Sequence, residues 1–404
     1  MSQEIEWLSG RGISAPRGFQ IGAARAGIKT QGKDVALLVA DEGATCAAVF
    51  TTSQVKAAPV LISAEHLSRS NPRAIVVNAG NANCCTGEAG MRNARKMCEF
   101  AASKLGLQAQ EILVCSTGII GHALPLEKIE SALGSITLDA SDEDAARAFM
   151  TTDTVPKFAA AQTQIGGETV TVGGQAKGVG MIGPNMAPLS VHATMLAFLT
   201  TDAKVETARL QRLLEIAVER SFNSVTVDGD MSTNDTAILL ASGTSKVEIS
   251  DQNESQFLEL LQAVCIELAR KIARDGEGAT RLIQIEVAGA ATERDARQIA
   301  LSIANSPLVK TAIFGRDPNW GRIAMAAGKA GVPFDASKLS FSLGEVALFH
   351  NGEPLSFDLA RAEFQLANED VFIRLQLGEG TADWTAWTCD FSYEYVKINA
   401  EYHT

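Results

Sequence analysis

A threonine near the middle of the chain is the first residue that suggests chemistry. Thr194 lies in the stretch HATMLAFLTTDA, residues 192–203, directly after the small residue Ala193. A threonine hydroxyl is a weak nucleophile unless a base takes its proton, and the threonine's own α-amine can be that base once the preceding peptide bond is cut. A free α-amine has a pKa of about 7.7 to 8.0, so part of it is neutral at pH 7. The alternative is a buried strand with no chemistry of its own.

Other catalytic patterns do not occur in the sequence. The five histidines form no HExxH or comparable metal-ligand spacing, and there is no GxSxG elbow. His192 is close to Thr194, but residues two apart on a strand are separated by about 7 Å. The acidic run VDGDMSTND lacks the glycine and glutamate that an EF-hand requires when counted from Asp228. We therefore predict no metal and no cofactor, and hydroxyls, lysines and carboxylates remain as candidate groups.

The glycine-rich run GVGMIG, residues 178–183, leaves a different function open. It fits GxGxxG, follows the strand-like ETVTVGG and precedes Asp202 by about 20 residues, which is the pattern of a dinucleotide site. Such a site needs a helix that begins at the third glycine, so that its amides meet the pyrophosphate. Pro184 and Pro188 follow instead. A tight loop is the alternative interpretation.

The composition is that of a globular protein with a large core. The chain has 404 residues, 46% of them apolar, and a mean hydropathy near zero. Its 35 basic and 47 acidic residues give a net charge of −12, and no stretch gathers enough basic residues for nucleic acid. Seven cysteines without CxxC spacing fit a reducing cytoplasm. Because there is neither a long apolar run nor a signal-peptide pattern, we expect no membrane partner and no secretion.

The elements that must position these residues are predicted in both halves of the chain. Short β-branched runs bounded by turn residues predict strands over 34–41, 45–51 and 74–80. Helical spacing of apolar residues predicts helices over 90–105, 203–220 and 254–273. Further strands are predicted at 223–230 and 235–243, as a pair, and at LIQIEVAG and VFIRLQLGEG. Since strands flank Thr194 on both sides, a sheet should receive segments from both halves, with helices covering the sheets.

A series of motifs resembles one protein family. KGVGMIGPNMA with ATMLAFLTTDA resembles the signature of the ornithine acetyltransferase family, also called glutamate N-acetyltransferase or ArgJ, whose members cut themselves at an Ala-Thr bond. VCSTGIIG, TTDTVPK, SFNSVTVDGDMSTNDT, ARDGEGATRLI, FGRDPNWGRI and the terminal INAEYHT resemble further family motifs in the family's order. Together they cover nearly the whole chain. The resemblance implies an α/β (α+β) fold, a DmpA/ArgJ-like αββα-type sandwich of mixed sheets covered by helices.

The resemblance also implies roles for individual residues. Thr194 would be the nucleophile, and cleavage after Ala193 would give an alpha chain, 1–193, and a beta chain, 194–404, that share one folded unit. A side-chain hydroxyl and a backbone amide, from Thr117 and Gly118, would form the oxyanion hole. The substrate-binding positions would be Thr154, Lys177, Thr194, Glu277, Asn399 and Thr404. A lysine suits a substrate carboxylate and a glutamate suits an amine. Taken alone, each residue keeps a plainer reading, such as a solvated lysine or a frayed tail.

The activity that the resemblance implies is acetyl transfer in arginine biosynthesis. The acetyl group would move from N2-acetyl-L-ornithine to L-glutamate through an acetyl-threonine ester, in a cytoplasmic enzyme whose alpha and beta chains associate as a heterotetramer of two each. Some members also use acetyl-CoA, and the sequence leaves this open. A related self-cleaving aminopeptidase or amidohydrolase is the alternative, beside a dinucleotide-binding protein. The chain departs from the family pattern PxMATML by the six residues PLSVHA, 188–193, so the effect on self-cleavage is open.

Overall fold

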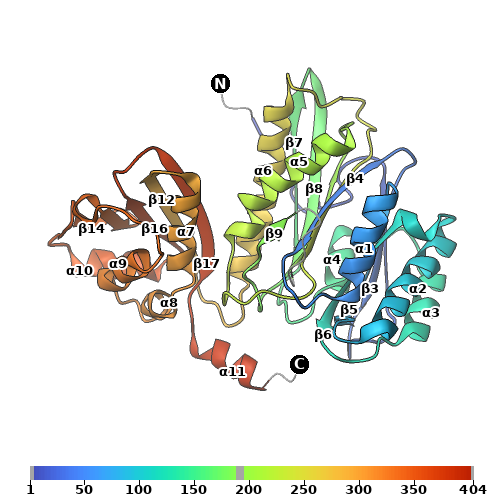
Figure 1. The fold of residues 1–404 in the computed structure, drawn as a ribbon, viewed down its shortest axis with the longest axis horizontal. Coiled ribbons are helices and arrows are strands. Elements are labelled where there is room, and N and C mark those ends of the chain that lie inside the picture. Colours follow the sequence, from blue (N-terminus) through green and yellow to red (C-terminus); the bar gives the residue numbers. More distant parts are fainter. Residues whose placement is uncertain (1–3, 188–194, 402–404) are drawn as a thin grey trace. The chain divides into compact units, whose positions relative to one another are not determined.

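The computed structural model describes residues 4–187 and 195–401, which fall into two compact units (Figure 1). Unit 1 holds the described residues up to Asn223 together with Met231–Leu268. Unit 2 holds Ser224–Asp230 and the described residues from Ala269 onward. The expected division into chains 1–193 and 194–404 follows a different boundary and stays a prediction.

Unit 1 is built on two sheets. The seven-stranded sheet has the order β1 (Glu6–Trp7), β7 (Lys157–Ile165), β8 (Glu168–Lys177), β10 (Leu196–Thr201), β11 (Thr236–Ala241), β4 (Thr45–Thr51) and β9 (Met186–Ala187). The four-stranded sheet has the order β2 (Phe19–Ala24), β3 (Val35–Ala40), β5 (Ala74–Asn81) and β6 (Ile112–Ile119). Both sheets mix parallel and antiparallel pairs.

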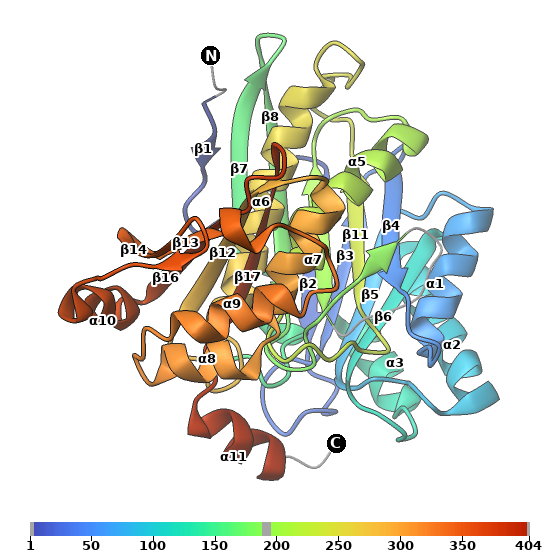
Figure 2. The same ribbon diagram turned by 60° about the vertical axis from the view of Figure 1, so that its left-hand side comes forward.

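The two sheets pack face to face, and helices cover their outer faces (Figure 2). Alternate residues on the strands divide between the two sides, as the pleat requires: Leu38 and Val77 face the other sheet, whereas Leu37 and Val76 face the helices. The helices on the four-stranded sheet are α1 (Ala58–Arg69), α2 (Gly87–Leu105) and α3 (Leu126–Ser135). Those on the seven-stranded sheet are α5 (Thr207–Glu219) and α6 (Glu254–Arg274), while α4 (Asp142–Ala148) adds to the core between the sheets. The predicted αββα arrangement is therefore confirmed in unit 1.

The seven-stranded sheet receives strands from both sides of residues 188–194. Strand β8 precedes this stretch and pairs antiparallel with β10, which follows it, with Lys177 opposite Leu196. Strand β10 in turn pairs in parallel with β11, with Leu196 opposite Thr236. The expectation that one sheet joins both halves of the chain is confirmed.

Unit 2 has one six-stranded sheet with helices on one face. Its order is β15 (Glu353–Pro354), β14 (Val346–His350), β13 (Ser340–Leu343), β16 (Asp370–Gln376), β12 (Leu282–Ala290) and β17 (Ala382–Cys389). The apolar side of β12, with Ile283, Ile285 and Val287, packs into a core with the helices. These are α7 (Glu293–Ala304), α8 (Pro307–Phe314), α9 (Trp320–Gly328) and α10 (Leu359–Ala367), and α11 (Tyr393–Glu401) follows β17.

Most predicted elements are confirmed, and one strand is wrong. The strands predicted at 34–41, 45–51 and 74–80 are β3, β4 and β5, and the three helices are α2, α5 and α6. The stretch 223–230, predicted to be a strand, contains only the end of a 3-10 turn (Phe222–Ser224) and a single bridge from Val225 to Trp387. The hydroxyl of Thr226 binds Asn305 and accepts the amide of Gly229, so this polar segment folds as a turn rather than joining a ladder.

Candidate active site

The expected oxyanion pair lies at a bulged strand end. Thr117 is fully buried near the end of β6, and Asn81 of the neighbouring β5 pairs with both Thr117 and Ile119. Gly118 has φ 127°, and a Cβ there would lie 2.4 Å from the carbonyl carbon of Gly80 and 2.6 Å from the amide nitrogen of Asn81. Only glycine fits this position, because both the backbone angle and the close approach exclude a side chain. The bulge thus places the two expected donors side by side on a rigid element.

Lys177 contacts one of these donors. It is the last residue of β8, its side chain is 4% exposed, and its Nζ donates to Oγ1 of Thr117 at 3.2 Å and to Oγ1 of Thr151 at 2.9 Å. A lysine ammonium only donates, so the oxygen of Thr117 is the acceptor in this bond. The hydroxyl proton of Thr117 can therefore be donated to a further acceptor, as an oxyanion hole requires. Lys177 was expected at the substrate, and the structure brings it together with Thr117.

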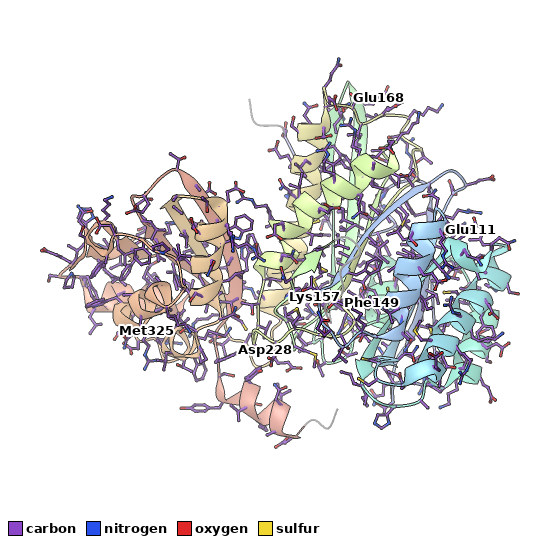
Figure 3. All side chains as sticks on the ribbon, viewed as in Figure 1. Glu111, Phe149, Lys157, Glu168, Asp228 and Met325 are labelled. Atoms are coloured by element: carbon purple, nitrogen blue, oxygen red, sulfur yellow. The ribbon has the colours of Figure 1, made fainter. Side chains whose placement is uncertain are left out.

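Sequence reasoning missed Asp153, which lies beside Lys177. Its carboxylate is fully buried, 2.7 Å from Nζ of Lys157 and 3.9 Å from Nζ of Lys177, and it accepts the amide of Gly178 at 2.8 Å. Burial alone would raise the pKa of Asp153, but the two lysines and the amide of Gly178 lower it to about 2. The carboxylate is thus ionised at neutral pH. Lys157 is drawn inside unit 1 in Figure 3.

Two further residues near Asp153 are Lys29 and Thr154. Lys29 donates to the carbonyl oxygens of Arg147 and Met150, both at 3.1 Å, and burial lowers its pKa against the opposing pull of Asp34 and Asp153. Thr154, an expected substrate contact, is exposed next to the buried Asp153. The signal for Asp153 and Lys157 was present in TTDTVPK, where the two charges are four residues apart, but their burial is a property of the folded chain.

The glycine-rich run forms a loop. Gly178 has φ 139° and Met181 has φ 54°, and the next element after Gly183 is the short strand β9, so the described residues after the third glycine form no helix. Asp202, which would bind the ribose of a dinucleotide, is buried and accepts the amide of Thr171 at 2.9 Å. The loop interpretation is confirmed, and the residues described here, up to Ala187, provide no helix that could meet a pyrophosphate.

Unit 2 brings two expected substrate-binding residues together. Nδ2 of Asn399, on α11, donates to Oε2 of Glu277 at 3.0 Å. Helix α11 is held to this loop because the hydroxyl of Ser392 donates to the carbonyl of Gly278 at 2.5 Å. Glu277 lies in the segment that joins α6 to β12, and the sequence pattern likewise predicts no strand or helix there.

Carboxylates gather around the same part of unit 2. The pKa of Tyr395 is raised first by burial and then by the nearby charges of Asp228, Asp230 and Glu277. Figure 3 labels Asp228. A concentration of negative charge favours an ammonium ion over a carboxylate at this place.

Three predicted site residues lie outside the described residues, namely Ala193, Thr194 and Thr404. Among the described residues, no group of three or more histidine, cysteine, aspartate or glutamate side chains is arranged to hold a metal ion. No helix within 4–187 and 195–401 has both the length and the apolar character needed to cross a membrane.

Comparison with known proteins identifies close relatives. A sequence model of the ArgJ family matches residues 20–404. The arginine biosynthesis bifunctional protein ArgJ of Gloeobacter violaceus is 47% identical over 412 residues, which cover 99% of this chain and 100% of that protein. A crystal structure of an arginine biosynthesis bifunctional protein ArgJ from Bacillus halodurans is 41% identical with a TM-score of 0.50, covering 51% of this chain and 98% of that one. An ornithine acetyltransferase from Mycobacterium tuberculosis, crystallised with ornithine, is 38% identical with a TM-score of 0.42, covering 46% of this chain and 100% of that one.

Proposed function

Because this chain belongs to the ArgJ family, we propose that it transfers the acetyl group of N2-acetyl-L-ornithine to L-glutamate through an ester on Thr194. The observation that carries the proposal is the oxyanion pair, Thr117 and Gly118, fixed at a bulged strand end with Lys177 donating to Thr117. Acyl transfer needs donors that are in place before the charge develops. In other acyl-transfer enzymes, removal of one such donor costs about 3 to 4 kcal/mol, or about 10² to 10³ in kcat.

The reaction runs in two half-reactions. The α-amine of Thr194 takes the proton of its own hydroxyl while Oγ1 attacks the acetyl carbonyl, and the oxyanion accepts bonds from the hydroxyl of Thr117 and the amide of Gly118. Collapse breaks the bond to the α-nitrogen of ornithine, which leaves with the proton that Thr194 held. The acetyl ester then reacts in the same way with the α-amine of glutamate, which restores the hydroxyl. Ping-pong kinetics follow from this order.

The substrate contacts divide by charge. We assign Glu277 and Asn399 to the side-chain ammonium of N2-acetyl-L-ornithine, because further carboxylates surround this part of unit 2. Thr154, Lys177 and Thr404 complete the proposed set. With Lys177 donating to Thr117 and Thr151, its charge would act on a substrate carboxylate and on the oxyanion hole together.

The nucleophile is made by self-cleavage. We infer that Thr194 attacks the carbonyl of Ala193, that the ester hydrolyses, and that chains 1–193 and 194–404 remain associated. The pairing of β8 with β10 supports this, since main-chain hydrogen bonds join strands from both products. Two copies of each chain would form the heterotetramer. Relatives are described as bifunctional, which supports a second activity that uses acetyl-CoA. The seven free cysteines support a reducing cytoplasm.

N-terminal sequencing and one substitution test this proposal. A denaturing gel of the purified protein should show two bands of similar mass, one of them beginning at Thr194, and Thr194→Ala should give a single inactive chain. Thr201→Ser, on the same strand segment, serves as the matched control and should still be cut. Incubation with labelled acetylornithine alone should release ornithine and leave label on the 194–404 chain.

Other outcomes identify the alternatives. An intact chain that is active on acetylornithine would exclude the N-terminal threonine mechanism. Two bands with inert acetylornithine and turnover of peptides would point to the aminopeptidase. An intact, inactive chain whose melting temperature rises with NAD would favour the dinucleotide reading.

A further inference from the structure

Each carboxylate oxygen of the buried Asp153 faces one lysine ammonium and one backbone amide. Oδ1 accepts from Nζ of Lys157 at 2.7 Å and from the amide of Gly178 at 2.8 Å. Oδ2 accepts the amide of Thr151 at 3.1 Å and lies 3.9 Å from Nζ of Lys177. Every one of these partners belongs to the short motif around Asp153 or to the end of β8 and the residue after it.

The carboxylate of Asp153 offsets the repulsion among the positive charges around Lys177. Lys157 and Lys177 are 1% and 4% exposed, so water screens them poorly. Lys29 is a third cation close enough to interact with Lys177. Asp153 is the carboxylate that faces both buried lysines among the described residues. Removing a negative charge from beside a buried ammonium lowers the pKa of that ammonium.

The protonation of Lys177 decides which way the hydroxyl of Thr117 points. As an ammonium, Lys177 can only donate, and Thr117 must accept from it. A neutral amine can also accept, so the proton of Thr117 could turn toward Lys177 and away from an oxyanion. The contact between Asp153 and Lys177 therefore acts on Thr117 through one intervening residue.

We propose that Asp153 is a positioning residue for acyl transfer, which holds Lys177 as an ammonium against Thr117 so that the hydroxyl of Thr117 donates to the oxyanion. This inference rests on the proposed function. Asp153 touches neither substrate nor the reacting atoms in this scheme. Its effect is carried by the order of donors and acceptors along Asp153, Lys177 and Thr117.

The test is the pH dependence of Asp153→Asn relative to the wild-type protein. The variant removes the charge and nearly preserves the shape. Because Lys177 then loses its proton at lower pH, the ratio of variant to wild-type kcat should fall as pH rises, by up to tenfold per pH unit, and should recover toward acid pH. Taking the ratio removes the titration of the Thr194 amine, which both proteins share. At the pH where Lys177 is neutral in the variant, we expect the loss to reach the order of 10² in kcat, the scale of one missing oxyanion donor.

A matched control separates this effect from the loss of a buried acid. Asp142 is buried in the same unit and accepts the amides of Gly12 and Ser14, at 2.8 and 2.9 Å. Asp142→Asn should lower the melting temperature while its kcat ratio stays flat with pH. Asp153→Glu keeps the charge and should also give a flat ratio. A pH-independent ratio for Asp153→Asn, or one equal to that of Asp142→Asn, would overturn the proposal.

Self-cleavage supplies a second readout, since the same donors serve the acyl shift. If Asp153→Asn is purified uncut, the rate at which it matures relative to wild type should rise as pH falls, and no such trend would overturn the proposal. If the variant precipitates, Thr117→Val, Lys177→Met and their double variant test the chain of contacts. The kcat of the double variant should be no lower than that of the slower single variant. If the two losses in kcat multiply, Lys177 does not act through Thr117. Failure of the proposed function is distinct, because the wild-type protein would then be uncut or inert on acetylornithine.

Discussion

Replacing Gly118 by alanine should damage both the stability and the activity of the protein, because two independent features of the structure oppose a side chain there. The φ of 127° belongs to a region that is nearly restricted to glycine, which costs about 1–3 kcal/mol for another residue. The new Cβ would lie 2.4 Å from the carbonyl carbon of Gly80 and 2.6 Å from the amide of Asn81, and both are backbone atoms that cannot rotate away. Crowding of this kind costs a further ~1–3 kcal/mol.

The expected loss is therefore about 2–6 kcal/mol in the free energy of unfolding. The matched control is Gly106→Ala, at the C-terminal end of α2, where φ is 69° and nothing lies within 4 Å of the added Cβ. That change should cost only ~1–2 kcal/mol, the price of the left-handed conformation. The comparison isolates the close approach at β6.

Urea unfolding followed by circular dichroism is the suitable assay. Three of the four tryptophans, Trp320, Trp384 and Trp387, belong to unit 2, so fluorescence would report mainly on the wrong unit. Folded Gly118→Ala should also show a kcat lowered by about 10² to 10³, because the amide at position 118 is displaced from the oxyanion. If Gly118→Ala unfolds at the same urea concentration as Gly106→Ala and keeps its kcat, the bulge does not fix the oxyanion hole.

Two further outcomes are expected. The pKa of Asp153 is lowered to about 2 from its ordinary 3.8, so its stabilising effect is complete above about pH 4 and is lost as pH falls toward 2. In urea titrations, the difference in the free energy of unfolding between wild type and Asp153→Asn should therefore shrink over that range. A difference that stays constant with pH would contradict this. Glu277→Gln should raise the KM for acetylornithine by roughly tenfold without slowing self-cleavage, as measured by steady-state kinetics and gel densitometry. An equal loss of activity on acetylornithine and of the self-cleavage rate would place Glu277 in the chemistry rather than in binding.

The strands and helices were predictable where the local pattern and the tertiary environment agree. The run VALLVA of β3 is apolar at every position, because one face meets the other sheet and the other meets helices, and such a run is recognisable in the sequence. The segment 223–230 has the alternation of a strand, but the hydroxyl of Thr226 satisfies backbone and side-chain groups nearby and the chain passes from one unit to the other there. The alternation of this segment does not reveal that it folds as a turn.

The site was predictable only in part for a similar reason. The family motifs predict roles for five described residues, and the structure brings Lys177 next to Thr117 and Asn399 next to Glu277. The role proposed for Asp153 depends on burial and on Lys177, which is 24 positions further along the chain and meets it through the pairing of β7 with β8. Why glycine is required at position 118 depends equally on a neighbour, Gly80, that the sequence does not mark.

The pairing of β10 with β8 and β11 has a consequence for how each molecule folds and refolds. While the chain is continuous, these strands find one another as parts of one polymer, and the entropy of bringing them together depends only on the length of the connecting segment. If the bond before Thr194 is cut as proposed, the same sheet would join two separate molecules. Reassembly after complete unfolding would then require an encounter in solution, at a rate set by protein concentration. Maturation would thus turn a reversible folding reaction into an event that each copy completes once.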